Sequence, residues 1–230
     1  MPHEIRRRTA ILAGLAACSA GTARAASGPV VLELFTSQGC SSCPPADALL
    51  GELARSPEVI GLAWHVDYWD RLGWRDPYSS RDWTNRQRAY AASLQAEVYT
   101  PALVINGSAM VVGSDRYRVQ NAMRAASALP LTVSLRRGPN GLVAEADGLP
   151  PDSTLSLVVY DPERATPVRA GENSGRRLQE FRIVREERVV ERFERRAMLP
   201  GVMPDQGAVL LVRDHRLRVL GAADARPSSG

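Results

Sequence analysis

Two cysteines separated by two serines, Cys40 and Cys43, stand between a predicted strand and a predicted helix. The run 29–36 is rich in β-branched and apolar residues and ends in a polar loop, which is typical of a buried strand. A proline pair follows Cys43, and proline suits the first turn of a helix because amides there lack partners within the helix. The apolar run 59–65 completes a strand–helix–strand unit, which predicts two parallel strands.

The position of Cys40 at the start of the helix favours redox chemistry. Unpaired amides and the helix dipole stabilise a thiolate, which is the nucleophile in disulfide exchange. Cys40 is the expected attacking thiol because it is nearer the exposed end, and Cys43 is expected to resolve the mixed disulfide. The alternative is a structural disulfide, although so short a loop constrains the unfolded chain little.

Residues 1–25 have the pattern of an export signal. Three arginines at 6–8 precede a short apolar run, and a small-x-small cleavage pattern places the mature start near Ala26. In a competing interpretation, Cys18 becomes the acylated first residue and carries a lipid anchor. The apolar run is too short to span a bilayer, so we expect a periplasmic or secreted protein without a transmembrane segment.

The composition narrows the functional classes. A hydrophobic content of 44% is enough for a folded core. All 29 basic residues are arginine and the net charge is only +4, with no continuous basic stripe, which argues against nucleic-acid binding. We expect no cofactor. His65 and His215 are the histidines beyond the leader, which leaves a zinc site short of ligands, whereas copper(I) on Cys40, Cys43 and His65 stays an alternative.

The chain divides into a first region at 26–129, a β-rich region at 130–225 and a loose tail at 226–230. The Arg/Glu-rich run 182–196 is interpreted as a long edge strand or a helix with a solvated face, and 171–175 as a turn. In the first region we further expect a loop at 67–80, a helix at 81–96, a hairpin of strands 102–105 and 109–112, and a helix at 115–128.

Thr100 and Pro101 come just before this hairpin, where an X-Pro bond entering a strand favours a cis peptide. A Cys-x-x-Cys after the first strand, Thr-Pro before a hairpin, an Asn-Gly turn and a closing helix together resemble the thioredoxin fold. The resemblance implies an α/β fold class, a thioredoxin-like fold with a C-terminal β-rich extension or small domain. It also implies that Thr100 and Pro101 lie against the cysteines and bind an extended substrate.

Three segments, FTSQGCSSCPPADALL, WHVDYWDRLGW and YTPALVINGSAMVVGS, are similar to a narrower family. This is the exported group catalogued as domain of unknown function 1223, which implies the fold and little established activity. The sequence differs from ordinary thioredoxins in its Ser-Ser dipeptide and in having Gly39 before Cys40. Because the dipeptide helps to set the redox potential, the redox direction stays open.

Four further residues are candidates for the site. Glu33 lies near the position at which thioredoxins keep a buried acid, so it is either a proton shuttle or an ion-paired or surface carboxylate. His65 and Asp67 lie at the carboxyl end of the second strand, at the same sheet edge as Cys40, where they contact substrate, tune the thiolate, or merely cap the strand and start a turn. Trp69 forms an apolar rim or packs under the loop.

These features predict an exported thiol–disulfide oxidoreductase that acts on a protein thiol or disulfide. The alternative is a non-enzymatic thioredoxin-like binding module, for example for copper delivery or metalloprotein assembly. The sequence does not determine the oligomeric state.

Overall fold

The computed structural model describes residues 28–227, and the elements of its first half follow the predicted order. They are β1 (Val30–Thr36), α1 (Pro44–Leu53), β2 (Val59–His65), the 3-10 helix η1 (Asp70–Leu72), α2 (Arg81–Leu94), β3 (Ala102–Ile105), β4 (Ala109–Val112) and α3 (Arg116–Ala125). The predicted strand–helix–strand unit is confirmed, since β1 and β2 are parallel and Thr36 lies opposite His65. The predicted hairpin is confirmed as β3 and β4.

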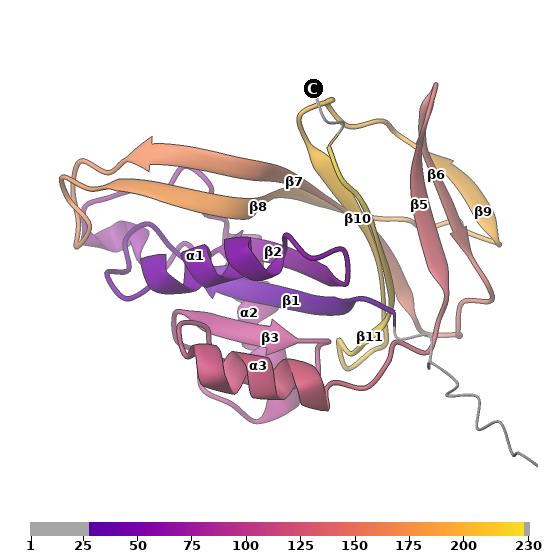
Figure 1. Cartoon of the computed structure of the whole chain (residues 1–230), viewed down its shortest axis with the longest axis horizontal. Helices are drawn as coiled ribbons and strands as arrows, with labels where there is room; N and C mark the ends of the chain where they lie inside the picture. Colours follow the sequence, from indigo (N-terminus) through magenta and orange to yellow (C-terminus); the bar gives the residue numbers. More distant parts are fainter. Residues whose placement is uncertain (1–27, 228–230) are drawn as a thin grey trace, which may run out of the picture.

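The second half is built of strands. They are β5 (Val133–Gly138), β6 (Gly141–Ala146), β7 (Thr154–Pro167), β8 (Arg177–Val189), β9 (Arg196–Leu199), β10 (Gly207–Arg213) and β11 (Val219–Ala225). Within the described residues, eight strands form one mixed sheet in the order β11-β10-β7-β8-β2-β1-β3-β4, and β5, β6 and β9 form a second (Figure 1). The large sheet therefore crosses the boundary predicted at residue 129.

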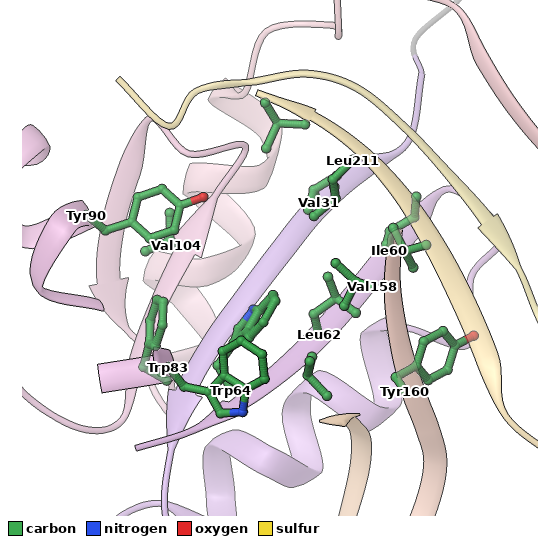
Figure 2. Packing of buried hydrophobic residues seen from close by; sticks show 14 of the residues in the cluster. Val31, Ile60, Leu62, Trp64, Trp83, Tyr90, Val104, Val158, Tyr160 and Leu211 are labelled. Atoms are coloured by element: carbon green, nitrogen blue, oxygen red, sulfur yellow. The ribbon is translucent and has the colours of Figure 1, made fainter. Parts of the chain in front are cut away.

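The alternating side chains of β1 divide the core into two layers. Leu32 and Leu34 point to the face covered by α1 and α3, where they pack with Leu49. Val31 and Phe35 point to the opposite face, which α2 covers. On that face Trp83 of α2 packs edge-on against Trp64 of β2, with ring centroids 4.7 Å apart (Figure 2).

Residues 182–189 of the Arg/Glu-rich run belong to β8, which lies between β7 and β2, so this part is an interior strand and not an edge strand or a helix. Residues 190–195 lie outside the strands, and the side chains from 185 to 196 are exposed or half-buried, in agreement with the predicted solvated face. Arg182 is buried, donates to the Gly61 carbonyl oxygen at 2.8 Å and pairs with Asp224 at 2.7 Å. Its guanidinium also stacks on Tyr160 at 3.8 Å. Partners supplied by distant strands thus allow a charged side chain inside the sheet.

The smaller sheet packs on β7, β10 and β11 through a third apolar cluster that includes Leu142, Leu157 and Leu210. Arg226, placed by sequence in a loose tail, donates to the carbonyl oxygens of Arg55 and Ser56. The predicted leader at 1–25 with Cys18 lies outside the described residues, as do residues 228–230. No helix in the described part is both long and apolar enough to cross a membrane.

Candidate functional site

Cys40 and Cys43 form a disulfide at the entrance to α1, with their Cα atoms 5.4 Å apart. Cys43 is the N-cap residue of α1, and its amide donates to the Cys40 carbonyl oxygen at 3.2 Å. The sequence placed Cys40 at the helix start, but that position belongs to Cys43. Both cysteines are fully buried, whereas the serines between them are exposed, and the hydroxyl of Ser42 lies 3.4 Å from Cys40 Sγ.

A cis peptide bond joins Thr100 and Pro101, as the sequence predicted. β3 begins at the next residue and runs antiparallel to β1, so this bond stands beside the strand that leads to the cysteines. Pro101 also approaches the first turn of α1, because both lie against Gly113. If Gly113 carried a Cβ, that atom would lie 3.2 Å from Ala46 Cβ in α1 and 3.5 Å from Pro101 Cβ. The topology therefore places the cis proline next to the helix that carries the disulfide.

Trp69, from the loop after β2, contacts both parts of this arrangement. Its indole Nε1 donates to Thr100 Oγ1 at 2.8 Å. Its own Cβ lies 3.0 Å from the point where a Cβ on Gly39 would stand, so a larger residue at position 39 would collide with it. Trp69 is half-buried. It therefore ties the cis-proline segment to the loop before Cys40.

The tip of the β7–β8 hairpin, which includes the predicted turn at 171–175, covers the disulfide loop. Asn173 is fully buried and its Nδ2 donates to the carbonyl oxygens of Gln38 and Cys40, each at 2.9 Å. The neighbouring Glu172 accepts a hydrogen bond from the Ser41 amide at 3.0 Å. These contacts hold the backbone on both sides of Cys40 from more than a hundred residues away in sequence.

Gln38 connects the disulfide loop to a buried group of titratable side chains. Its backbone amide donates to Asp76 Oδ2 at 2.8 Å, and its side-chain Nε2 donates to Glu180 Oε2 at 2.7 Å. The same Asp76 oxygen lies 2.7 Å from His65 Nδ1. His65 is fully buried, so it lies beneath the disulfide loop rather than on a surface that meets substrate.

Asp47 completes this group from α1. It lies four residues after Cys43, is 5% exposed, and accepts a hydrogen bond from Thr36 Oγ1 at 3.0 Å. Burial raises the pKa of Asp47 to about 8, although the charge of His65 opposes the shift. Burial also disfavours the charged form of His65, but the adjacent Asp76, together with Glu180 and Asp47, outweighs it and raises the His65 pKa to about 9.

Glu33 lies on the other face of the sheet from α1, among residues that pack with α2. Its Oε2 accepts a hydrogen bond from Arg86 Nε at 2.8 Å, and its Oε1 accepts one from the Tyr90 hydroxyl. Arg86 also pairs with Glu187 at 3.0 Å, and Glu187 pairs with Arg213. This is the ion-paired alternative of the two roles considered for Glu33, and the residue faces away from the cysteines.

Asp67 also has a local partner. Its amide donates to Thr84 Oγ1 at 3.1 Å, and that hydroxyl donates back to Asp67 Oδ1 at 2.5 Å. The pair joins the end of the β2 segment to the first turn of α2. Four of the predicted site residues thus lie around the disulfide loop: Thr100, Pro101, Trp69 and His65. The other two, Asp67 and Glu33, form hydrogen bonds with side chains of α2.

A family model described as "Protein of unknown function (DUF1223)" matches residues 31–210. The chain belongs to the DUF1223 family. The match extends from β1 to β10 and so includes the cysteines, the cis proline and the hairpin tip that covers them. The family resemblance seen in the sequence is therefore confirmed. No curated protein matches the chain.

Two solved structures resemble this DUF1223 protein. A crystal structure of a protein from Agrobacterium tumefaciens, a structural genomics target, is 26% identical with a TM-score of 0.74 and covers 89% of this chain and 96% of its own. HBP35 of Porphyromonas gingivalis is 15% identical with a TM-score of 0.58, covering 89% of this chain and 78% of its own. The second likeness concerns the fold alone.

Replacing Asn173 by alanine is expected to weaken the attachment of the β7–β8 hairpin tip to the disulfide loop of this DUF1223 protein. The change removes the side-chain donor to the Gln38 and Cys40 carbonyl oxygens, and only the Cys40 oxygen keeps another donor, the Cys43 amide. Leaving the Gln38 oxygen unpaired costs about 1–3 kcal/mol of unfolding free energy. Reduction of the disulfide by dithiothreitol should become several-fold faster, because the segment over Cys40 opens more often. Ser174→Ala, on the exposed side of the same tip, is the control. Equal reduction rates for both variants would show that Asn173 does not hold the hairpin tip over Cys40.

The buried titratable groups predict how stability depends on pH. The pKa of His65 is raised from 6.5 to about 9, so its contribution is present in full below pH 6.5 and is lost as pH rises through about 9. The pKa of Asp47 is raised from 3.8 to about 8, so its contribution to stability is also lost with rising pH, over the range between these two values. The melting temperature of the disulfide form should therefore fall between pH 6.5 and 9. A flat or rising melting temperature over that window would contradict the assignment.

Proposed function

We propose that this protein is a thiol–disulfide oxidoreductase whose redox centre is the Cys40–Cys43 pair. The observation that carries the proposal is the juxtaposition of a two-cysteine disulfide at the start of α1 with the Thr100–Pro101 segment, which approaches the first turn of α1 and is held by Trp69. A purely structural disulfide has no need of a neighbouring substrate-binding segment. An exchange centre needs both a reactive pair and a backbone surface that holds the partner.

The fold supports the same proposal. Parallel β1 and β2, the antiparallel β3 and β4, and helices α1 and α3 on one face with α2 on the other form the arrangement expected of a thioredoxin-like unit. The second half adds strands to that unit rather than replacing any part of it. We assign the redox function to the first half and the covering of the site to the β7–β8 hairpin.

Exchange starts from the disulfide form. A substrate thiolate attacks Cys40 Sγ, the Cys40–Cys43 bond breaks, and Cys43 leaves as a thiolate that then takes up a proton, while the substrate sulfur stays joined to Cys40 in a mixed disulfide. A second substrate thiolate that attacks the mixed disulfide releases oxidised substrate and leaves both cysteines reduced. In the reverse direction Cys40 attacks a substrate disulfide and Cys43 resolves it. The hydroxyl of Ser42, 3.4 Å from Cys40 Sγ, is placed to donate to the Cys40 thiolate.

The surrounding residues have separate tasks in this proposal. Thr100 and Pro101 present backbone to an extended partner, and Trp69 fixes Thr100 by its indole hydrogen bond. Because both sulfurs are buried, the hairpin tip with Asn173 must move before a protein can reach Cys40. The partner is a protein thiol or disulfide, and the predicted export signal places the reaction in the periplasm or outside the cell.

Metal delivery, the alternative function, has no specific observation in its favour. Among the described residues, no three His, Cys, Asp or Glu side chains are grouped so as to hold a metal ion. His65, the residue that a copper site would recruit, is held at Nδ1 by Asp76.

Catalysed exchange with protein substrates tests the proposed function. The disulfide form is mixed with a reduced, unfolded protein, and the dithiol form is mixed with a disulfide-bonded protein, each with a glutathione buffer for turnover. We expect multiple turnovers in at least one direction, and the faster direction identifies the protein as oxidant or reductant. Rates equal to those of glutathione alone in both directions would exclude the function.

A further inference from the structure

A buried group of four titratable side chains lies on the inner side of the disulfide loop. Asp47, His65, Asp76 and Glu180 come from α1, β2, the loop after β2 and β8, and none is more than 5% exposed. Thr36 binds Asp47 and lies opposite His65 in the register of β1 and β2, so α1 holds Asp47 over the end of β2.

Two atoms of this group lack partners. Asp47 Oδ1 and His65 Nε2 are fully buried and have no hydrogen-bond partner among the described residues. His65 Nε2 lies 4.0 Å from Glu180 Oε1, a distance beyond hydrogen-bond reach. Buried polar atoms are normally paired, because an unpaired one costs free energy. An unpaired carboxyl oxygen and an unpaired imidazole nitrogen, held together, indicate a place where a proton is kept and exchanged.

Asp47 is also the acid nearest to Cys43 along α1. It follows Cys43 by four residues, a spacing that puts two side chains on the same helix face. The backbone amide of Asp47 donates to the Cys43 carbonyl oxygen at 3.2 Å. Cys43 is fully buried, so bulk water does not reach its sulfur directly. A thiolate formed there needs a proton source inside the protein.

We propose that Asp47 is the acid–base residue that gives a proton to Cys43 and takes it back, with His65 as the charge that stabilises the ionised Asp47. This inference rests on the proposed function and names the proton-transfer group of the same site. Asp47 thereby takes the role for which the sequence had offered Glu33, which lies on the other face of the sheet.

The step balances in both directions. A substrate thiolate attacks Cys40 Sγ, the Cys40–Cys43 bond breaks, and Cys43 leaves with the electron pair. The Asp47 carboxylic acid transfers its proton to the Cys43 thiolate and becomes a carboxylate beside protonated His65. In the reverse step the Asp47 carboxylate takes the proton from the Cys43 thiol, and Cys43 then attacks the mixed disulfide, releasing the substrate thiolate.

The charges that face Asp47 from each neighbouring element agree with this role. Burial raises its pKa to about 8, His65 of β2 lowers it, and Glu180 of β8 raises it, as does Asp76 from the loop. From β1 the Thr36 hydroxyl donates to the ionised form and lowers it. Asp47 thus carries a proton at neutral pH and can lose it to a thiolate of similar basicity.

Reduction by dithiothreitol tests the proposal through its pH profile. For the unmodified protein, the rate constant per dithiothreitol thiolate should be level at neutral pH and fall above pH 8, where Asp47 ionises. In Asp47→Asn the fall near pH 8 should disappear, and the rate at pH 7 should drop by about 100-fold, the lower end of general acid catalysis. Glu52→Gln, an acid-to-amide change at an exposed position of α1, is the matched control and should keep both features.

Two results would overturn the proposal. One is an Asp47→Asn variant with the unmodified rate and profile, and the other is a variant slowed at every pH that keeps the fall near pH 8. If the variant does not fold, the Cγ resonance of Asp47 in carbon-labelled unmodified protein replaces it. We expect a titration midpoint near pH 8 in the disulfide form and a different midpoint in the dithiol form, and identical midpoints would reject the role.

The outcomes separate this inference from the proposed function. If dithiothreitol reduces the protein with the fall near pH 8 but protein substrates are not turned over, the function fails and the proton assignment stands. If protein substrates are turned over and Asp47→Asn keeps the unmodified profile, the function stands and the assignment fails.

Discussion

Replacing Cys40 by serine is expected to abolish exchange with protein thiols and disulfides, because the attacking sulfur is removed. Loss of a covalent nucleophile lowers the turnover rate by about 1,000-fold or more. Replacing Cys43 by serine should have a different result: Cys40 still attacks, but nothing resolves the product. The Cys43→Ser variant should therefore accumulate a mixed disulfide with its substrate, visible by intact-mass spectrometry and released by dithiothreitol.

The asymmetry between the two cysteines is the informative part. Ser174→Ala keeps both cysteines, removes an exposed hydroxyl at the tip of the β7–β8 hairpin, and serves as the control with unchanged exchange activity. If Cys40→Ser trapped substrate and Cys43→Ser did not, the order of attack would be reversed. If neither variant lost activity, the pair would not be the redox centre.

Replacing Arg86 by methionine is expected to cause the largest loss of stability among single changes outside the cysteines. Arg86 is 9% exposed and pairs with the fully buried Glu33, as well as with Glu187. The change leaves a buried carboxylate without its main countercharge, and breaking such a pair costs about 3–5 kcal/mol. Urea unfolding at pH 7 measures the difference, with an unchanged slope showing that the unfolded state is comparable.

Arg116→Met is the control for this change. Arg116 forms a salt bridge with Glu52 on the surface of α3 and α1, with both side chains about half exposed. Exposed pairs contribute little, so this variant should unfold at the same urea concentration as the unmodified protein. Equal destabilisation by the two variants would contradict the structural role given to Glu33 and Arg86.

The local part of the fold and of the site follows directly from the sequence. β1, α1, β2 and the β3–β4 hairpin have clear apolar periods and turn residues, and neighbours along the chain decide their form. The same signals predicted the cis Thr100–Pro101 bond and the cysteine pair. These features depend on short stretches, so a sequence pattern is sufficient.

The distant contacts could not be predicted in this way. Arg182 and Asn173 lie in segments that look solvated, and only pairing with remote strands and loops shows that they are buried. The face on which Glu33 lies, that of α2 and Arg86, could not be predicted either, because one residue of register decides which face of the sheet a side chain meets. Asp47 did carry a signal, a carboxylate on the apolar face of α1 near Ala46 and Leu50.

The equilibrium of the Cys40–Cys43 pair with a glutathione buffer, measured with the thiolate pKa of Cys40 in the same sample, tests the central claim most directly. A redox-active centre predicts a depressed Cys40 pKa and a potential between about −270 and −120 mV, and the value indicates reductant or oxidant. An ordinary thiol pKa together with a potential below about −300 mV would identify a structural disulfide and contradict the oxidoreductase assignment.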